Sequence, residues 1–372
     1  MKILKKLASV CLSAAVLAGC VAGCGGSGAK KTAEPTKPST RVITDIAGNQ
    51  VTVPATVKKI AITPLPWASI VYTIDGSSER IGAIHPGAMS AYKGCFLETK
   101  DKHFGTLNTK LVNQNFTVNM EGLANEGIDS VIMWKYQQKD ADKLKEVKVP
   151  ALLIYNDTVD NLKKSFMIVG QLLGKEQRAK QICEYYDDAY KKIGAHKAEV
   201  EKAKKPTILF IRNAKLRLQG NDNFMHQAIE MGGGHNPISQ SSLDSNNKNI
   251  SMEEVYKMNP DIIFLSNFDK FVPDDLYNNK IAGQDWSSVK AVKDRRVYKV
   301  PMGIYRWDAP GVETPLMMKW FAHVLQPEIF KDIDVRADAK KFYKDFMNYE
   351  LTDKDLSVIF ADEVNKNSKP LF

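Results

Sequence analysis

The chain contains the same short pattern twice, about half a chain apart. Residues 118–132 read VNMEGLANEGIDSVI and residues 250–264 read ISMEEVYKMNPDIIF. In each copy a small polar residue precedes Met-Glu, an apolar residue follows two positions later, and an aspartate opens an apolar run. The polar residue is typical of a helix N-cap, and the apolar run is typical of a buried strand. A helix–strand unit that occurs twice predicts two similar lobes.

Apolar strand segments alternate with helical segments in both halves of the chain. The first half opens with a hairpin at residues 41–53, which turns at Gly48-Asn49. The strands are then expected at residues 59–63, 80–85, 129–134, 151–155, 207–212, 261–266 and 296–300, and the helices at residues 67–74, 140–147, 223–231, 313–325 and, as a final pair on the second lobe, 337–360. This alternation predicts an α/β fold whose parallel sheets are covered on both faces.

Residues 159–205 contain no strand candidate. Apolar residues recur there at helical spacing, and the positions between them are heavily charged, as on a solvated face. We expect a long, rigid connecting helix between an N-terminal lobe at residues 41–158 and a C-terminal lobe at residues 206–372.

The N-terminus has the order of a secretory leader. Three lysines precede an apolar stretch at residues 7–17, and Leu17-Ala18-Gly19-Cys20 then resembles a bacterial lipobox. We expect residues 1–19 to be a signal peptide, Cys20 to be lipidated, and residues 20–40 to be a flexible tether. An ordinary cleaved signal or a membrane anchor is the alternative. The protein is thus expected outside the cytoplasm, held at the membrane by its lipid alone.

Charge, cysteines and motifs exclude several functions. The net charge of +9 is dispersed, so a nucleic-acid partner is not expected.

Beyond the lipobox, Cys95 and Cys183 share no metal-ligand spacing, and their pairing stays open. Gly232–Gly234 follow a predicted helix and read as its stop rather than as a phosphate loop. No nucleophile-elbow or metal-site spacing is present, so neither an enzyme nor an intrinsic cofactor is expected.

Several motifs in correct order resemble one known family. They are TDIAGNQVTVP followed by KKIAI, the two Met-Glu units, WSSVKAVK followed by RVYKVP at residues 296–301, and the PGVETP core between Trp307 and Trp320. From about residue 41 onward the chain is similar to the substrate-binding lipoproteins of ABC importers for metal chelates. These proteins bind ferric siderophores, haem, cobalamin and related ligands.

The resemblance implies an architecture and a partner. Two Rossmann-like lobes would face each other across a central cleft, joined by a long helix, in a protein that is expected to be a monomer. The partners would be an ABC permease and its ATPase, and one acidic residue of each lobe would meet permease arginines. The matching residues here are Glu121 and Glu253, with Glu254 as a substitute for the latter. The alternative is that each glutamate only supports its own helix N-terminus.

The ligand is expected beyond the carboxyl ends of the strands, as in other open α/β sheets. Aromatic walls suit planar or catecholate ligands, and arginines suit an anionic chelate. The candidate ligand-binding residues are Trp67, His85, Trp134, Tyr136, Arg212, Tyr305, Arg306 and Trp307, with Asp308 placed to hold Arg306. His103 is a candidate metal ligand that would complete the coordination of an unsaturated chelate, as His85 also could. Each aromatic could instead pack between lobes or helices, and each histidine could be structural.

The sequence therefore predicts a receptor that captures a metal chelate, with a ferric siderophore as the first choice. Haem, cobalamin, a nickel chelate and an oxyanion remain open. A two-lobed lipid-anchored enzyme and a sensor without an importer are the competing functions.

Overall fold

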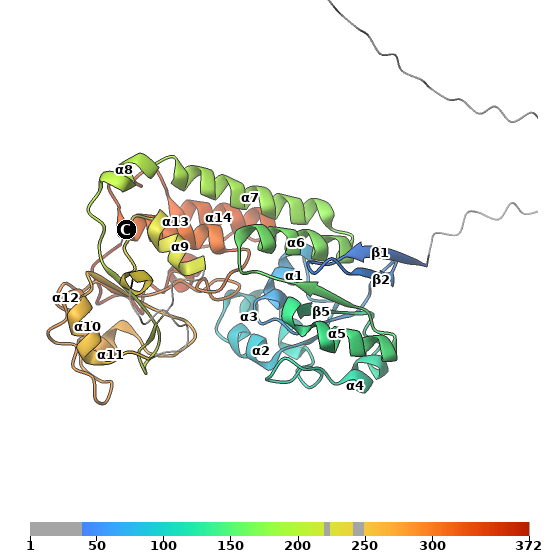
Figure 1. Cartoon of the computed structure of the whole chain (residues 1–372). Coiled ribbons are helices and arrows are strands. Elements are labelled where there is room, and N and C mark those ends of the chain that lie inside the picture. Colours follow the sequence, from blue (N-terminus) through green and yellow to red (C-terminus); the bar gives the residue numbers. More distant parts are fainter. Residues whose placement is uncertain (1–38, 219–223, 241–248, 372) are drawn as a thin grey trace, which may run out of the picture. The chain divides into compact units, whose positions relative to one another are not determined.

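The computed structural model of the protein describes residues 39–218, 224–240 and 249–371 (Figure 1). The expected signal peptide, Cys20 and nearly all of the tether lie outside these residues. Within the described ranges, no helix is both long enough and apolar enough to cross a membrane.

The first lobe begins with the predicted hairpin. β1 (Thr40–Thr44) pairs antiparallel with β2 (Gln50–Pro54), and Gly48 takes a positive φ of 89° in the turn between them. A sheet of four parallel strands follows in the order β4-β3-β5-β6. Its strands are β3 (Ile60–Ile62), β4 (Ile81–Ile84), β5 (Ser130–Trp134) and β6 (Ala151–Ile154). They are almost wholly buried, as the apolar runs predict for a parallel sheet.

Short helices connect these strands. They are α1 (Trp67–Asp75), α2 (Pro86–Tyr92), α3 (Phe96–Lys100), α4 (Met120–Asn125) and α5 (Gln138–Leu144). The predicted helices at 67–74 and 140–147 are confirmed as α1 and α5, whereas α2 and α3 had no counterpart in the prediction.

The segment expected as one connecting helix is divided into three. α6 (Val159–Leu173) ends where Gly174 takes a left-handed conformation, and α7 (Glu176–Gly194) begins two residues later. A Cβ on Gly170 would lie 2.6 Å from that of Ala179, so the glycine permits α6 and α7 to pack closely. α7 is the long helix of the connection and α8 (Lys197–Lys202) completes it (Figure 1).

The sheet of the second lobe has three parallel strands and one short antiparallel strand. β7 (Ile208–Asn213), β9 (Ile262–Leu265) and β10 (Val297–Lys299) are parallel in the order β10-β9-β7, and the short β8 (Arg217–Leu218) lies antiparallel at the edge. The helices of this lobe are α9 (Phe224–Met231), α10 (Met252–Met258), α11 (Pro273–Tyr277) and α12 (Lys290–Lys293). The three parallel strands match their predicted positions, and β8 was not predicted.

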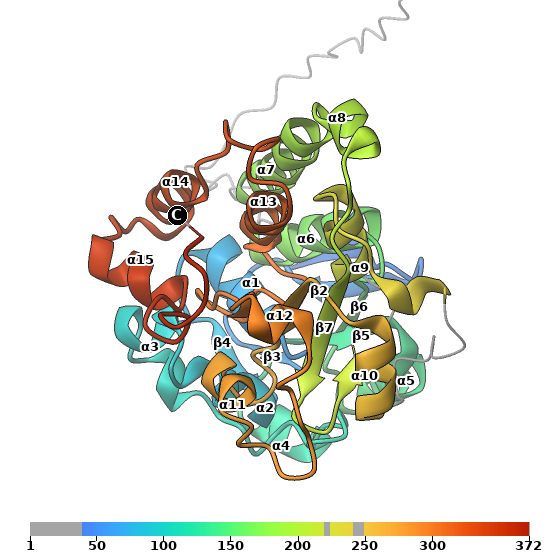
Figure 2. The same ribbon diagram turned by 90° about the vertical axis from the view of Figure 1, so that its left-hand side faces the viewer.

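The C-terminal helices contact both lobes. α13 (Thr314–Leu325) packs against α7 and α9, and α14 (Val335–Met347) packs against α13 (Figure 2). Phe96 of α3 meets Tyr343 of α14 with ring centroids 4.9 Å apart. The expected final pair of helices is present as α14 and α15 (Asp353–Ile359), and α14 extends to the first lobe through Tyr343.

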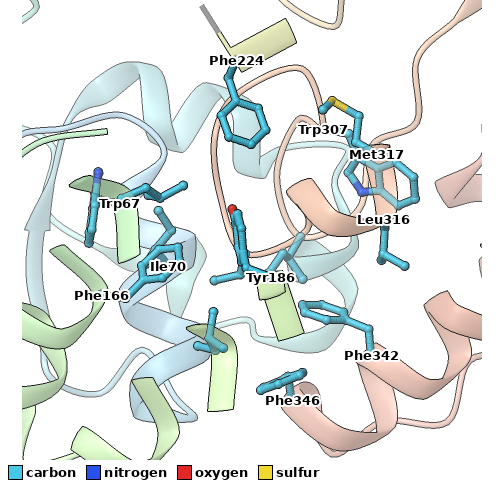
Figure 3. Packing of buried hydrophobic residues seen from close by; sticks show 14 of the residues in the cluster. Trp67, Ile70, Phe166, Tyr186, Phe224, Trp307, Leu316, Met317, Phe342 and Phe346 are labelled. Atoms are coloured by element: carbon cyan, nitrogen blue, oxygen red, sulfur yellow. The ribbon is translucent and has the colours of Figure 1, made fainter. Parts of the chain in front are cut away.

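One apolar core runs through the junction of the lobes. Trp67 of α1 packs on Phe166 of α6, and the same cluster continues through Tyr186 of α7 to Leu316 and Phe342 (Figure 3). Each Å² of apolar surface that is removed from water contributes about 25 cal/mol to stability. Separation of the lobes would expose the apolar side chains of this junction to water, so it is opposed by the hydrophobic effect.

The duplicated unit has the same local structure in both lobes. The Asn119 side chain accepts a hydrogen bond from the Gly122 amide at 3.0 Å, and Ser251 accepts one from the Glu254 amide at 3.2 Å. Each unit thus begins with a capped helix, as predicted.

The aspartate of each unit also has the same role in both lobes. The Asp129 carboxylate accepts the Lys59 amide at 2.9 Å, and the Asp261 carboxylate accepts the Thr207 amide at 2.8 Å. Lys59 and Thr207 each precede the first parallel strand of their sheet. Each aspartate therefore ties its helix–strand unit to the strand with which the lobe begins.

Candidate functional site

Three strand ends in the second lobe bring two arginines to one phenylalanine. Arg212 lies near the end of β7, Phe268 follows β9, and Arg306 lies in the loop after β10. The guanidinium carbons of Arg212 and Arg306 are 4.8 Å and 4.6 Å from the centroid of the Phe268 ring. Because Phe268 is 38% exposed, this arrangement reaches the surface at the carboxyl edge of the sheet.

The two guanidinium groups have few polar partners inside the protein. The Arg212 side chain forms no hydrogen bond or ion pair with any residue that the structure describes. Arg306 donates one long hydrogen bond of 3.5 Å to the Tyr305 hydroxyl, and its buried Nε has no partner among the described residues. An arginine has five N–H donors, so most of them remain available to a ligand.

Asp308 joins the Arg306 loop to the Phe268 loop. Its buried carboxylate accepts hydrogen bonds from the Ser266 hydroxyl and from the Asn267 amide, the latter at 3.2 Å. Burial raises the pKa of Asp308, while the Ser266 hydrogen bond and the charges of Arg212 and Arg306 act in the opposite direction. The expectation that Asp308 holds Arg306 is corrected, because the hydrogen bonds of its carboxylate to described residues go to the neighbouring loop.

Lys299 supports the same loop from below the surface. Its buried ammonium group donates hydrogen bonds to the carbonyls of Ser266, Asp269 and Phe271 at 2.7, 2.7 and 3.0 Å. Burial lowers the pKa of Lys299 to about 8, and the nearby charges of Asp308 and Asp269 partly oppose that shift.

The carboxyl edge of the second sheet therefore brings three cationic side chains together. Arg212, Arg306 and Lys299 surround the single buried carboxylate of Asp308. Burial lowers the pKa of Arg212, but an arginine remains a cation at any physiological pH. The arrangement is suited to an anion that can accept several charge-assisted hydrogen bonds.

The first lobe contributes aromatic surface at the carboxyl end of β5. Trp134 and Tyr136 stack with ring centroids 6.2 Å apart and planes 23° apart, and Tyr136 is 66% exposed. Buried Gln137 holds this turn, since its side-chain oxygen accepts from the Thr63 hydroxyl at 2.9 Å and from the Trp134 amide at 3.1 Å. Its amide nitrogen donates to the Phe116 carbonyl at 2.8 Å. Trp134 and Tyr136 therefore lie at the carboxyl edge of the sheet, and their contact with a ligand stays a prediction.

Three predicted ligand contacts are buried in the structure. Trp67 packs on Phe166, as Figure 3 shows, and Trp307 packs against Phe360 at 5.4 Å between centroids. Tyr305 packs with Ala91 of α2, so it contacts the first lobe. These side chains follow strand ends, but the opposite lobe, α6 or the C-terminal helices cover them, so they are removed from the ligand surface.

His85 is also engaged structurally. It is buried as the N-cap of α2, where its Nδ1 accepts the Gly87 amide at 2.9 Å. That hydrogen bond places the ring proton on Nε2, which lies 3.2 Å from the Gln114 carbonyl. Neither nitrogen then has a lone pair for a metal, and burial lowers the pKa of the ring. The prediction that His85 contacts the ligand is corrected.

His103 lies at the wrong end of the first sheet. It is exposed, and its Nδ1 is 2.8 Å from the hydroxyl of Ser78, a residue that precedes β4. It therefore sits at the amino end of the strands, opposite the aromatic surface, and its prediction as a metal ligand is corrected. Across the described ranges, no group of three or more His, Cys, Asp or Glu residues is arranged to hold a metal ion. Cys95 and Cys183 are both buried free thiols.

Sequence reasoning missed Phe268, Lys299 and Gln137 as site residues. Phe268 lies just beyond the strand expected at residues 261–266, and an aromatic residue at such a place was its signal. Lys299 could have been noticed as a lysine within the apolar run VYKV. Gln137 had no sequence signal, because two of its three hydrogen bonds go to Thr63 and Phe116, which are distant from it in the chain.

The two glutamates of the duplicated unit occupy equivalent positions. Glu121 and Glu253 are exposed in the first turns of α4 and α10, and neither pairs with another described residue. Glu254 differs, because its carboxylate accepts the Ser251 amide at 2.7 Å in a capping box. Of the two adjacent glutamates, Glu253 is the one whose carboxylate has no partner in the part of the chain that the structure describes.

Comparisons with known proteins agree with this architecture. A family model described as "Periplasmic binding protein" matches residues 93–302. The crystal structure of a periplasmic solute binding protein from Veillonella parvula is 40% identical, with a TM-score of 0.83 over 90% of this chain and 100% of that chain. The molybdate-binding protein MolA of Haemophilus influenzae is 22% identical over 82% of this chain and 90% of its own. The Fe(3+)-citrate-binding protein YfmC of Bacillus subtilis is 23% identical over 80% of this chain and 89% of its own.

Proposed function

Because the chain belongs to the periplasmic binding protein family, we propose that it captures an anionic metal chelate, with a ferric siderophore as the first choice. We further propose that it is lipid-anchored outside the cytoplasm and delivers the chelate to an ABC permease and its ATPase. Its relatives are solute-binding proteins of ABC transporters rather than enzymes.

The observation that carries the proposal is the pair of guanidinium groups on Phe268. Arg212 and Arg306 reach one exposed ring, and their donors are largely unpaired within the described residues. Unpaired cationic donors at a sheet edge favour an anion that accepts their hydrogen bonds. Two of the relatives are named for molybdate and for Fe(3+)-citrate, and both of these ligands are anions.

The aromatic surface of the first lobe favours a chelate over a small ion. The exposed face of Tyr136, stacked on Trp134, suits a ligand with planar or apolar parts. With His85 and His103 engaged elsewhere, we propose that the chelator supplies the metal's ligands. Haem, cobalamin and a nickel chelate are the alternatives with planar or macrocyclic parts, and an oxyanion is the alternative that needs only the arginines.

A ligand titration tests this proposal. The purified protein without its leader and tether would be titrated with ferric citrate, ferric catecholate siderophores, haem, cobalamin and molybdate, and tryptophan fluorescence would be followed. Trp134 is expected to report binding because it lies beside the exposed Tyr136. Tight binding of a ferric chelate supports the proposal, molybdate alone would favour the oxyanion alternative, and no response to any of these ligands would refute metal-chelate capture.

We also propose that Glu121 and Glu253 dock the protein on its permease. Exposed, unpaired carboxylates in equivalent turns of both lobes can form bidentate pairs with permease arginines, which set orientation more than affinity. The double variant Glu121→Ala, Glu253→Ala should bind ligand normally and fail to support uptake in cells. Glu254→Ala is the matched control and should retain uptake. Normal uptake by the double variant would exclude this docking, and loss of uptake in the control would reassign it.

A further inference from the structure

A buried lysine holds the loop that carries Phe268. The Lys299 ammonium group has three N–H donors, and each meets one backbone carbonyl of residues 266–271 at 3.0 Å or less. Its hydrogen-bond partners are all backbone carbonyls, so the cation fixes the course of the backbone rather than neutralising an acid. We refer to residues 266–271 as the Phe268 loop.

The Phe268 loop is tied to both arginine-bearing segments. The Asp269 carboxylate accepts the Ala214 amide at 2.8 Å, two residues after Arg212. The Ser266 hydroxyl donates to Asp308, two residues after Arg306. A shift of this loop would therefore move the Phe268 ring and disturb both guanidinium groups that lie on it.

We propose that Lys299 is a positioning residue of the anion site, whose charged ammonium group holds the Phe268 loop in the conformation that presents Arg212 and Arg306 together. Loss of its proton releases one carbonyl and weakens anion binding. This inference rests on the proposed function, because it assumes that the two arginines bind the ligand. Lys299 itself is buried behind the loop and does not touch the anion.

The surroundings of Lys299 place its titration within an accessible range. Burial is the largest influence and disfavours its charged form, as Arg306 also does, while Asp308, Asp269 and Asp275 favour that form. The Phe271 ring lies 5.2 Å from the ammonium nitrogen. The resulting pKa is about 8. A neutral amine keeps two donors and gains a lone pair, so one of the three carbonyls would lose its hydrogen bond above that pH.

The experiment compares Lys299→Met with a matched buried lysine. Methionine preserves the length of the side chain but donates no hydrogen bond, and Lys299→Gln serves as a second variant that keeps two neutral donors. Lys319→Met is the control, because Lys319 is equally buried in the second lobe but pairs with Asp338 on α14, away from the strand ends. Molybdate and ferric citrate are the probes, and molybdate keeps its double charge throughout the alkaline range.

Two measurements follow from the proposal. In the ligand-free proteins, amide hydrogen exchange of residues 266–271 should be faster in Lys299→Met than in wild type at the same pH, and unchanged in Lys319→Met. In titrations, wild-type affinity should fall about tenfold between about pH 7 and pH 9.5, as expected for loss of one charge-assisted hydrogen bond. Lys299→Met and Lys299→Gln should bind weakly at both pH values with no such fall, and Lys319→Met should follow wild type.

The outcomes separate this inference from the proposed function. Unchanged exchange in the Phe268 loop of Lys299→Met, or wild-type affinity and pH dependence in that variant, would overturn the role of Lys299. A pH-dependent fall that persists in both Lys299 variants would do the same. A wild-type protein that binds neither probe would count against the proposed function, and the exchange measurement would still decide whether Lys299 holds the loop.

Discussion

Replacement of Arg306 by alanine gives the sharpest test of the anion site. The side chain lies 4.6 Å from the Phe268 centroid, and it has one long hydrogen bond to Tyr305 and a buried Nε without a described partner. If the ligand accepts a charge-assisted hydrogen bond from it, the loss should be about 1.5–3 kcal/mol, or about 10- to 150-fold in Kd.

The same contacts predict little change in folding stability. The cation–π contact contributes about 0.5–2 kcal/mol, while the unsatisfied buried Nε costs about 1–3 kcal/mol, so the two nearly cancel. The free energy of unfolding of Arg306→Ala should therefore change by less than about 1 kcal/mol. A large loss of stability would show that the loop depends on this side chain in a way that its contacts do not explain.

The assay is a fluorescence titration with the best ligand of the panel, accompanied by a urea unfolding curve. Arg336→Ala is the matched control, since Arg336 lies 4.8 Å from the Phe360 ring but pairs with Asp362 on the C-terminal helices. The control should lower stability and leave Kd unchanged. Unchanged affinity in Arg306→Ala would remove this residue from the site and show that its free donors do not bind the ligand.

Three further predictions concern stability and are tested by denaturant titration. Burial raises the pKa of Glu313 to about 7, so the folded protein holds this proton more tightly than the unfolded chain does. The contribution of Glu313 to the free energy of unfolding should therefore fall by about 3 kcal/mol as the pH rises from about 4.5 to about 7. Glu313→Gln should flatten that part of the pH profile, and an unaltered slope would contradict it. Gly303→Ala should destabilise the folded protein by about 1–3 kcal/mol, because the added Cβ would overlap the Glu313 carboxylate. An unchanged stability would show that the loop around residue 303 can move to make room for the methyl group. Asp129→Ala and Asp261→Ala should each lower the free energy of unfolding by about 1–3 kcal/mol, because each leaves a backbone amide at the start of a sheet without its acceptor. A loss of stability in only one of the two variants would show that the two aspartates are not equivalent.

Much of the fold could be predicted from local patterns. The parallel strands are nearly continuous apolar runs, and the duplicated unit has a cap and an aspartate at fixed spacing. Both patterns can therefore be recognised from a short stretch of consecutive residues. The division of the connecting segment was less visible, because Gly174 is compatible with either a continued helix or a left-handed end. β8 was missed because a two-residue strand has no periodicity.

The candidate site was predicted only in part. Arg212, Arg306, Trp134 and Tyr136 do lie at strand ends, since the carboxyl edge of a parallel sheet follows from strand order. The rule selects loops, but it does not say which side chain of a loop is covered. Trp67, Trp307 and Tyr305 follow strand ends equally well and are nevertheless buried.

The two-lobed α/β plan, the carboxyl edges of both sheets and the equivalent glutamates follow from local periodicity or from a repeat, and both can be read in the sequence. The folded chain was needed to show that Phe268 receives both arginines, that Lys299 supports its loop, and that His85 caps a helix. Exposure, hydrogen-bond partners and desolvation arise where segments distant in the chain meet, and a short stretch of sequence does not contain both sides of such a contact.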